Sequence, residues 1–162
     1  MQVSTVAPAP RRMASGVLPP SKSKGAYAMR VRDLMSAPVV TIRSDEDYKT
    51  GLTLMQKNAL HHLPVVDAGG RVVGIAAERD LLIAATRFLG SSIEVGEVMH
   101  RGAVTTRADE PVSAAARLML GHRIGSLPVI NADGQVIGLV TETDLFRHFV
   151  ETALQEESGT RT

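Results

Sequence analysis

The chain contains the same unit twice. When the sequence is shifted against itself by 64 residues without a gap, residues 31–82 align with residues 95–146. Nineteen of the 52 aligned positions carry the same residue, and most of the others are conservative changes. So long an ungapped repeat predicts two structurally equivalent units, neither of which has to be stable without the other.

Each copy has the pattern of a mixed unit with the order β-α-β-β-α. In the second copy, turn-forming residues at 131–134 separate two segments rich in β-branched residues, which is typical of a β-hairpin. Apolar residues at intervals of three and four predict amphipathic helices around the hairpin. Two helices on one face of a three-stranded sheet leave its other face bare. We therefore expect an α/β (α+β) fold in which tandem repeats pack sheet to sheet.

The expected element boundaries follow from capping and turn signals. The first strands are expected at 39–42 and 103–105. The first helices should begin near Ser44 or Asp45 and near Asp109, where acidic residues favour a helix N-terminus. The remaining expected elements are short opening turns at 31–35 and 95–99, and second helices at 78–89 and 142–155.

Charge is distributed unevenly along the chain. Residues 1–32 contain six basic residues and no acidic one, so the remainder carries 12 basic and 17 acidic residues. We interpret residues 1–28 as a disordered, basic, Pro-rich tail, with an organelle transit peptide or an over-extended start as alternatives. A nucleic-acid-binding arm is disfavoured because the charges are scattered.

The expected organisation is a first repeat at 29–90, a second repeat at 91–156 and a disordered C-terminal tail at 157–162.

The composition argues against several functions. The chain has no cysteine, which removes disulfides, thiol catalysis and thiolate metal sites. No apolar run approaches the roughly 18 to 20 residues that span a membrane, and we expect a cytoplasmic protein. The serines do not lie in a nucleophile motif, and the histidines are not spaced to bind one metal ion. We therefore expect neither an enzyme nor a metal site.

A hydroxyl and a carboxylate follow the hairpin of the second copy. Thr141 and Asp144 lie three residues apart where the strand gives way to a helix, and free backbone N–H groups are found at such a position. The first copy retains the carboxylate as Asp80 but has Ala77 in place of the hydroxyl. Both aspartates could be simple helix caps or ligand-binding groups.

Two motifs occur in both copies at the same spacing: the first strand of the hairpin with the residues before it, and the second strand with the aspartate after it. Together they resemble the CBS (cystathionine-beta-synthase) domain, which occurs as a tandem pair called a Bateman module. The carriers are residues 123–130 with 138–144 in the second copy and residues 61–67 with 74–80 in the first. The resemblance implies a regulatory pair that binds AMP, ADP, ATP, NAD or S-adenosylmethionine in two clefts between the repeats. It also implies a homodimer.

The resemblance assigns roles to particular residues. Asp144 with Thr141, and Asp80, would contact the ribose hydroxyls, because a carboxylate can accept from both hydroxyls at once. His61 and the adjacent His62 would reach the phosphates, and partial protonation would make phosphate affinity pH-dependent. Further phosphate candidates are Arg79, Arg123 and Arg147. The residues expected against the base are Val40, Thr41, Val104, Thr105, Val65 and Val129. Pro64 and Pro128 are also expected among the binding residues.

The sequence thus predicts a stand-alone ligand-sensing module without an effector domain of its own. Binding of an adenine nucleotide would change the relative orientation of the repeats, and thereby the geometry of a homodimer or of an unidentified protein effector. The alternative is a structural dimerisation or partner-docking module with degenerate clefts, an interpretation that Ala77 favours.

Overall fold

A computed structural model describes residues 29–88 and 91–159, with side chains as far as residue 155. The expected basic tail at 1–28 lies outside the described residues, as do residues 89–90 and 160–162. In the first repeat the elements are α1 (Val31–Leu34), β1 (Ile42–Arg43), α2 (Tyr48–Asn58), β2 (His62–Val66), β3 (Val72–Ala77) and α3 (Glu78–Arg87). In the second they are α4 (Val95–Val98), β4 (His100–Arg101), β5 (Thr106–Arg107), α5 (Val112–His122), β6 (Ser126–Ile130), β7 (Val136–Thr141) and α6 (Glu142–Gly159).

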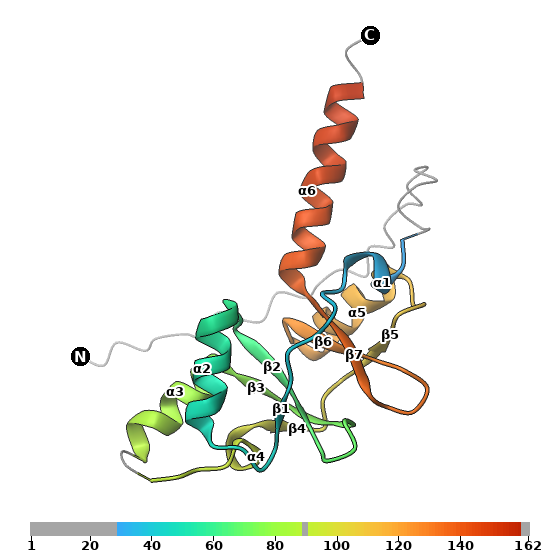
Figure 1. The fold of residues 1–162 in the computed structure, drawn as a ribbon. Helices are drawn as coiled ribbons and strands as arrows, with labels where there is room; N and C mark the ends of the chain where they lie inside the picture. Colours follow the sequence, from blue (N-terminus) through green and yellow to red (C-terminus); the bar gives the residue numbers. More distant parts are fainter. Residues whose placement is uncertain (1–28, 89–90, 160–162) are drawn as a thin grey trace, which may run out of the picture.

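Two small mixed sheets organise these elements (Figure 1). One has the strand order β1-β2-β3-β4 and the other the order β5-β6-β7. In each sheet the first strand is parallel to the second, and the second and third form an antiparallel hairpin. The ladder shifts register at Val65/Val66 and at Val129/Ile130, which are equivalent positions. The predicted β-α-β-β-α order and the mixed α/β class are confirmed.

Several expected boundaries were wrong. The first strands begin only at Ile42 and Thr106, because the residues before them run between the two repeats. The helix α2 begins at Tyr48, since the Asp47 carboxylate caps it by accepting from the Lys49 N–H at 2.8 Å. Hydrogen bonds from the Ser92 hydroxyl and from this N–H lower the pKa of Asp47. In α5 the residue at the N-cap position is Pro111.

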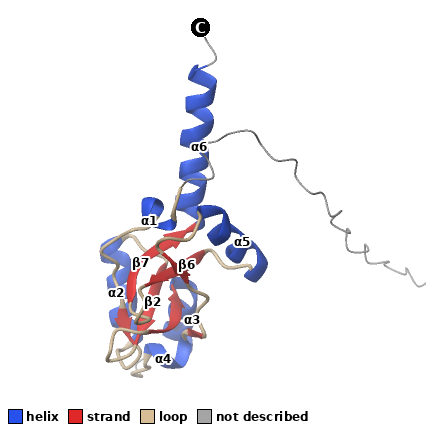
Figure 2. Ribbon diagram, turned by 90° about the vertical axis from the view of Figure 1, so that its right-hand side faces the viewer, coloured by secondary structure: helices blue, strands red, loops and turns tan. Residues whose placement is uncertain are grey.

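The last helix is also longer than expected. It continues to Gly159, three residues into the segment interpreted as a C-terminal tail, and projects away from both sheets (Figure 2). The β4 strand was not expected at all; it pairs with β3 from the other repeat.

The opening turns of the two repeats are exchanged. Val31 of α1 is fully buried in the core of the second repeat, against Leu127, Val129 and Val140. Its N–H donates to the Glu110 carbonyl oxygen at 2.9 Å. Val95 of α4 is fully buried in the core of the first repeat, and its N–H donates to the carbonyl of Glu46 at 2.8 Å. Each core is therefore completed by a segment that precedes the other repeat's sheet.

The hairpins also meet each other across a pseudo-twofold axis. The N–H of Val72 donates to the Gly134 carbonyl at 3.4 Å, and that of Val136 donates to the Gly70 carbonyl at 3.3 Å. Val72 and Val136 are equivalent in the repeat, as are Gly70 and Gly134. Two matching hydrogen bonds at equivalent positions show that the repeats pack as near-symmetric partners, and this symmetry gives the module two related clefts.

Candidate functional site

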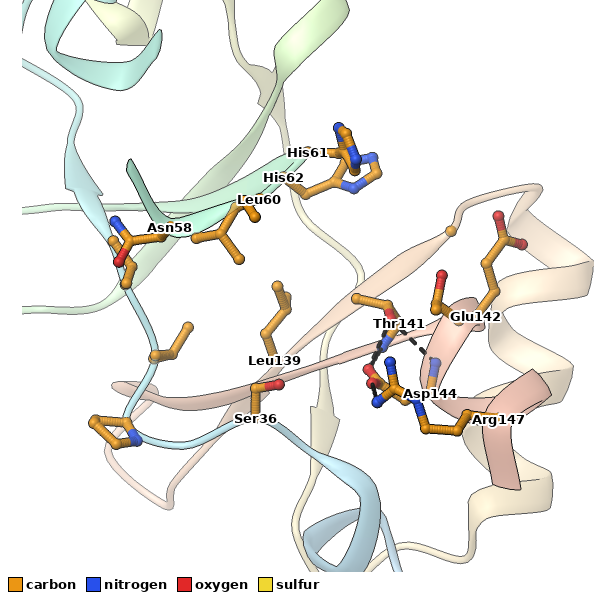
Figure 3. A pocket seen from close by; sticks show the side chains of 16 residues that line it. Ser36, Asn58, Leu60, His61, His62, Leu139, Thr141, Glu142, Asp144 and Arg147 are labelled. Atoms are coloured by element: carbon orange, nitrogen blue, oxygen red, sulfur yellow. Dashed lines mark hydrogen bonds and ion pairs between the residues drawn. The ribbon is translucent and has the colours of Figure 1, made fainter. Parts of the chain in front are cut away.

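A cavity of about 670 Å³ lies between the repeats and is lined by both of them. We call it the Asp144 cleft. The second repeat contributes Thr141, Glu142, Asp144 and Arg147, and the first contributes His61, His62 and Val40. Figure 3 shows Thr141, Asp144 and Arg147 together on one wall and the two histidines on the other.

Thr141, the other polar residue of the motif, holds the side chain of Asp144 in place. Its side chain is only 13% exposed, and its Oδ2 atom accepts from the Thr141 N–H at 2.8 Å and from the Thr141 hydroxyl at 2.7 Å. Its Oδ1 atom lies 3.7 Å from Arg147 Nη1. One carboxylate oxygen is thus used for capping, while the other forms no hydrogen bond with a described residue. The capping and ligand-binding interpretations are compatible.

The opposite wall carries His61 and His62. His61 is exposed, and its Nδ1 atom lies 2.7 Å from Glu78 Oε2. His62 is half-buried, and burial lowers its pKa. The neighbouring His61 lowers the pKa of His62 further, whereas the carboxylates of Glu142 and Asp80 raise it. An anionic group beside His62 would favour its protonated form.

A second cavity, of about 510 Å³, surrounds Asp80. We call it the Asp80 cleft. The Asp80 side chain is 18% exposed; its Oδ2 atom lies 2.8 Å from His100 Nε2 and its Oδ1 atom 3.8 Å from Arg79 Nε. Where Thr141 holds Asp144, the imidazole of His100 from β4 therefore holds Asp80, and Ala77 lines the cleft without a hydroxyl.

Sequence reasoning missed His100 and Arg101. Both belong to β4, which the hydrophobic pattern did not reveal because two exposed polar residues carry no strand signal. The 64-residue shift aligns His100 with Ser36, which lines the Asp144 cleft. That this position faces a cleft is seen only in the structure.

Not every expected residue reaches a cleft. Val40 and Arg147 line the Asp144 cleft, and Val104, Arg79 and Arg123 line the Asp80 cleft. The residues that line neither cavity are Thr41, Thr105, Pro64, Pro128, Val65 and Val129. The prolines and the two valines are packed inside the hairpins, with less than 2% of their surface exposed, so they support the clefts from behind.

Residues 29–88 and 91–159 contain no group of three or more histidine or acidic side chains arranged to hold a metal ion. Within the same ranges, no helix combines the length and the apolar character needed to cross a bilayer.

The CBS domain family model matches residues 31–87 and 95–151. A CBS domain-containing protein of Dictyostelium discoideum is 36% identical over 126 residues, which cover 71% of this chain and 87% of that protein. Several archaeal enzymes also match, but the chain spans only about a quarter of their length.

Solved structures with the same fold include two nucleoside or nucleotide complexes. One is the CBS domain pair of protein MJ0100 with 5'-methylthioadenosine and S-adenosyl-L-methionine (31% identity, TM-score 0.68, covering 75% of this chain and 99% of that one). The other is CBSX2 with AMP (25% identity, TM-score 0.66, covering 76% and 98%).

Proposed function

Since this chain belongs to the CBS domain family, with one CBS domain in each half, we propose that it is a regulatory module that binds adenosine nucleotides or derivatives in its two clefts. The complexes of its structural relatives with AMP, 5'-methylthioadenosine and S-adenosyl-L-methionine support this ligand class. On this proposal the chain senses a ligand and performs no chemistry on it.

The observation that carries the proposal is the Thr141–Asp144 pair at the start of α6. Asp144 faces a cavity with a carboxylate oxygen available, and a carboxylate can accept from both vicinal hydroxyls of a ribose. Val40 and Leu60 on the facing wall offer apolar contact for a base. His61, His62 and Arg147 offer donors to a phosphate.

The proposed regulatory mechanism depends on which repeat contributes each wall of a cleft. Each cleft takes one wall from each repeat, so a ligand contacts both repeats at once. Such a ligand binds best in one relative orientation of the repeats and increases the population of that orientation. We expect this change to be passed to whatever the helices contact.

We further propose a homodimer that pairs through the outer helices. The exposed apolar residues of this face are Leu120 on α5 and Phe146, Phe149 and Val150 on α6. Leu120, Phe146 and Phe149 line a largely apolar cavity of about 680 Å³. Leu82 of α3 is equivalent to Phe146 and is also exposed, so both repeats present apolar surface at matching positions. A surface with internal twofold symmetry suits a second copy of itself.

Titration calorimetry with AMP, ATP and S-adenosylmethionine tests ligand binding. We expect at least one to bind, and Asp144→Asn to weaken a binding event at least tenfold, because it removes charge-assisted hydrogen bonds to the ribose. Asp133→Asn, in the exposed turn of the second hairpin, is the matched control and should bind normally.

Absence of binding by all three ligands would contradict the proposal. It would instead favour a docking module with degenerate clefts, for which Ala77 remains the supporting feature. Unchanged affinity in Asp144→Asn would show that Asp144 only caps α6.

Sedimentation velocity tests the homodimer. We expect the mass of two copies at micromolar concentration, and Phe149→Ser should weaken association at least tenfold because the side chain is 69% exposed on α6. Ile137→Ser, at a less exposed apolar position on β7, is the control. A monomeric wild-type chain would refute the dimer and leave ligand binding untouched.

A further inference from the structure

The two clefts differ in charge. The Asp80 cleft is lined by three arginines, Arg79, Arg101 and Arg123, against the single carboxylate of Asp80. The Asp144 cleft is lined by Arg147 against two carboxylates, Glu142 and Asp144. Each cleft also has its own histidine, His100 or His61, and both share His62, so the histidines do not cancel the difference.

The difference arises from individual substitutions between the repeats. Under the 64-residue shift, Arg79, Arg101 and Arg123 correspond to Thr143, Ala37 and Ala59. Conversely, Arg147 corresponds to Ile83. The backbones of the clefts are therefore related by symmetry, while their positive charges are not.

The guanidinium groups of the Asp80 cleft have donors to spare. Arg123 lies at the C-cap of α5 with φ 56°, is exposed, and forms no ion pair with a described residue. Arg101 uses one nitrogen to donate to the carbonyl of Gly96 at 2.9 Å. Arg79 is 84% exposed and only 3.8 Å from Asp80. A guanidinium offers five N–H donors in a planar fork, so each group can still bind a phosphate.

We propose that the clefts sort adenosine ligands by charge: the Asp80 cleft binds a nucleoside di- or triphosphate, and the Asp144 cleft binds an adenosine derivative with little negative charge. This inference rests on the proposed function. Three arginines beside one carboxylate attract a polyphosphate, whereas two carboxylates beside one arginine repel it. The module would then read two ligands at once, one in each cleft.

Calorimetry with adenosine, AMP, ADP and ATP on the full chain tests the sorting. We expect affinity at one site to rise at least tenfold from adenosine to ATP and to fall with added salt. Arg123→Gln should weaken ATP binding about tenfold and leave adenosine binding unchanged. Arg123 is chosen for substitution because its side chain, unlike that of Arg101, donates no hydrogen bond to the backbone on which the fold could depend.

Two matched variants control for general charge. Arg107→Gln removes a positive charge from the exposed position of β5, outside both cavities, and should leave the whole series unchanged. Arg117→Gln removes a positive charge from an exposed position on α5, also outside both cavities, and should leave ATP binding within twofold of wild type.

Substitution of the two aspartates distinguishes failure of the charge sorting from failure of the proposed function. We expect Asp80→Asn to remove the ATP-preferring site and Asp144→Asn to remove the adenosine site. If instead Asp144→Asn weakened ATP binding, or if affinity were flat across the series, the sorting would be overturned while the proposed function stood. If no ligand of the series bound, nor S-adenosylmethionine, the proposed function itself would fail.

Discussion

His62 contributes to both clefts, and its protonation is coupled to folding as well as to ligands. Burial lowers its pKa in the folded chain, so the unfolded chain binds this proton more readily. The charged and titratable groups around it are His61, Glu142 and Asp80. Its contribution to stability is therefore complete above the unfolded pKa of about 6.5 and decreases as the pH falls through the lower folded value.

We predict that His62→Gln makes stability less dependent on pH. Wild type should lose free energy of unfolding between pH 7 and pH 5, and the variant should lose less, because glutamine does not titrate. Urea unfolding at several pH values measures this. His122→Gln, at the exposed end of α5, should retain the wild-type pH dependence. A variant curve parallel to that of wild type would contradict the prediction.

At the scale of elements, a glycine in each hairpin allows the other repeat's linker to pass. A Cβ atom on Gly74 would lie 2.6 Å from the His100 carbonyl oxygen, and one on Gly138 would lie 2.6 Å from Met35 Sδ. Gly74 pairs with Arg101 in the sheet. These glycines belong to the motif that carries the family resemblance, and their role is to admit the strand or turn that places His100 or Ser36 in a cleft.

We predict that Gly74→Ala destabilises the chain by about 1–3 kcal/mol, because a backbone oxygen cannot move aside as a side chain would. The same change should displace β4 and weaken binding at the Asp80 cleft. Gly121→Ala is the control: it lies in α5 with open space around it and should stabilise by up to about 1 kcal/mol.

Urea unfolding and calorimetry measure the two effects of Gly74→Ala. Stability and binding equal to wild type would mean that β4 does not need the close approach.

At the scale of the whole molecule, the exchanged turns make each repeat depend on the other. Val31 precedes the first sheet but is buried in the second core, and Val95 shows the reverse. The domain boundaries expected from the repeat, 29–90 and 91–156, are therefore crossed by two packed segments. On the proposed mechanism, a ligand that reorients the repeats would also move these segments and so couple both cores to both clefts.

We predict that Val31→Ala costs about 2 kcal/mol, from two methyl groups lost and the cavity left behind. Amide hydrogen exchange should show the loss of protection first in β6 and β7, although the substitution lies in the first repeat. Val95→Ala should instead affect β2 and β3. Lys57→Ala, at an exposed position on α2, is the neutral control. Loss of protection in β2 and β3 for Val31→Ala would refute the exchange.

Local physics explains what the sequence by itself determined. Turn residues, apolar spacing and the duplicated motif depend on near neighbours, so the element order, the hairpins, the mixed α/β class and the pairing of Thr141 with Asp144 were all predictable. The alignment of the repeats also shows that Arg79 and Arg123 align with the uncharged residues Thr143 and Ala59, so this part of the charge difference was readable from the sequence.

The tertiary structure decided which repeat completes which core and which wall each residue joins. Val31 packs in one core with Val140, and Val40 lines the same cavity as Asp144, although each pair is more than 100 positions apart in the sequence, so no local pattern encodes these arrangements. Only the tertiary structure shows that His100 and Arg101 line a cleft and that Pro64 and Pro128 are buried. The reason is physical: a sheet with one bare face must bury it, and the geometry of that burial is chosen by the packing of the whole molecule.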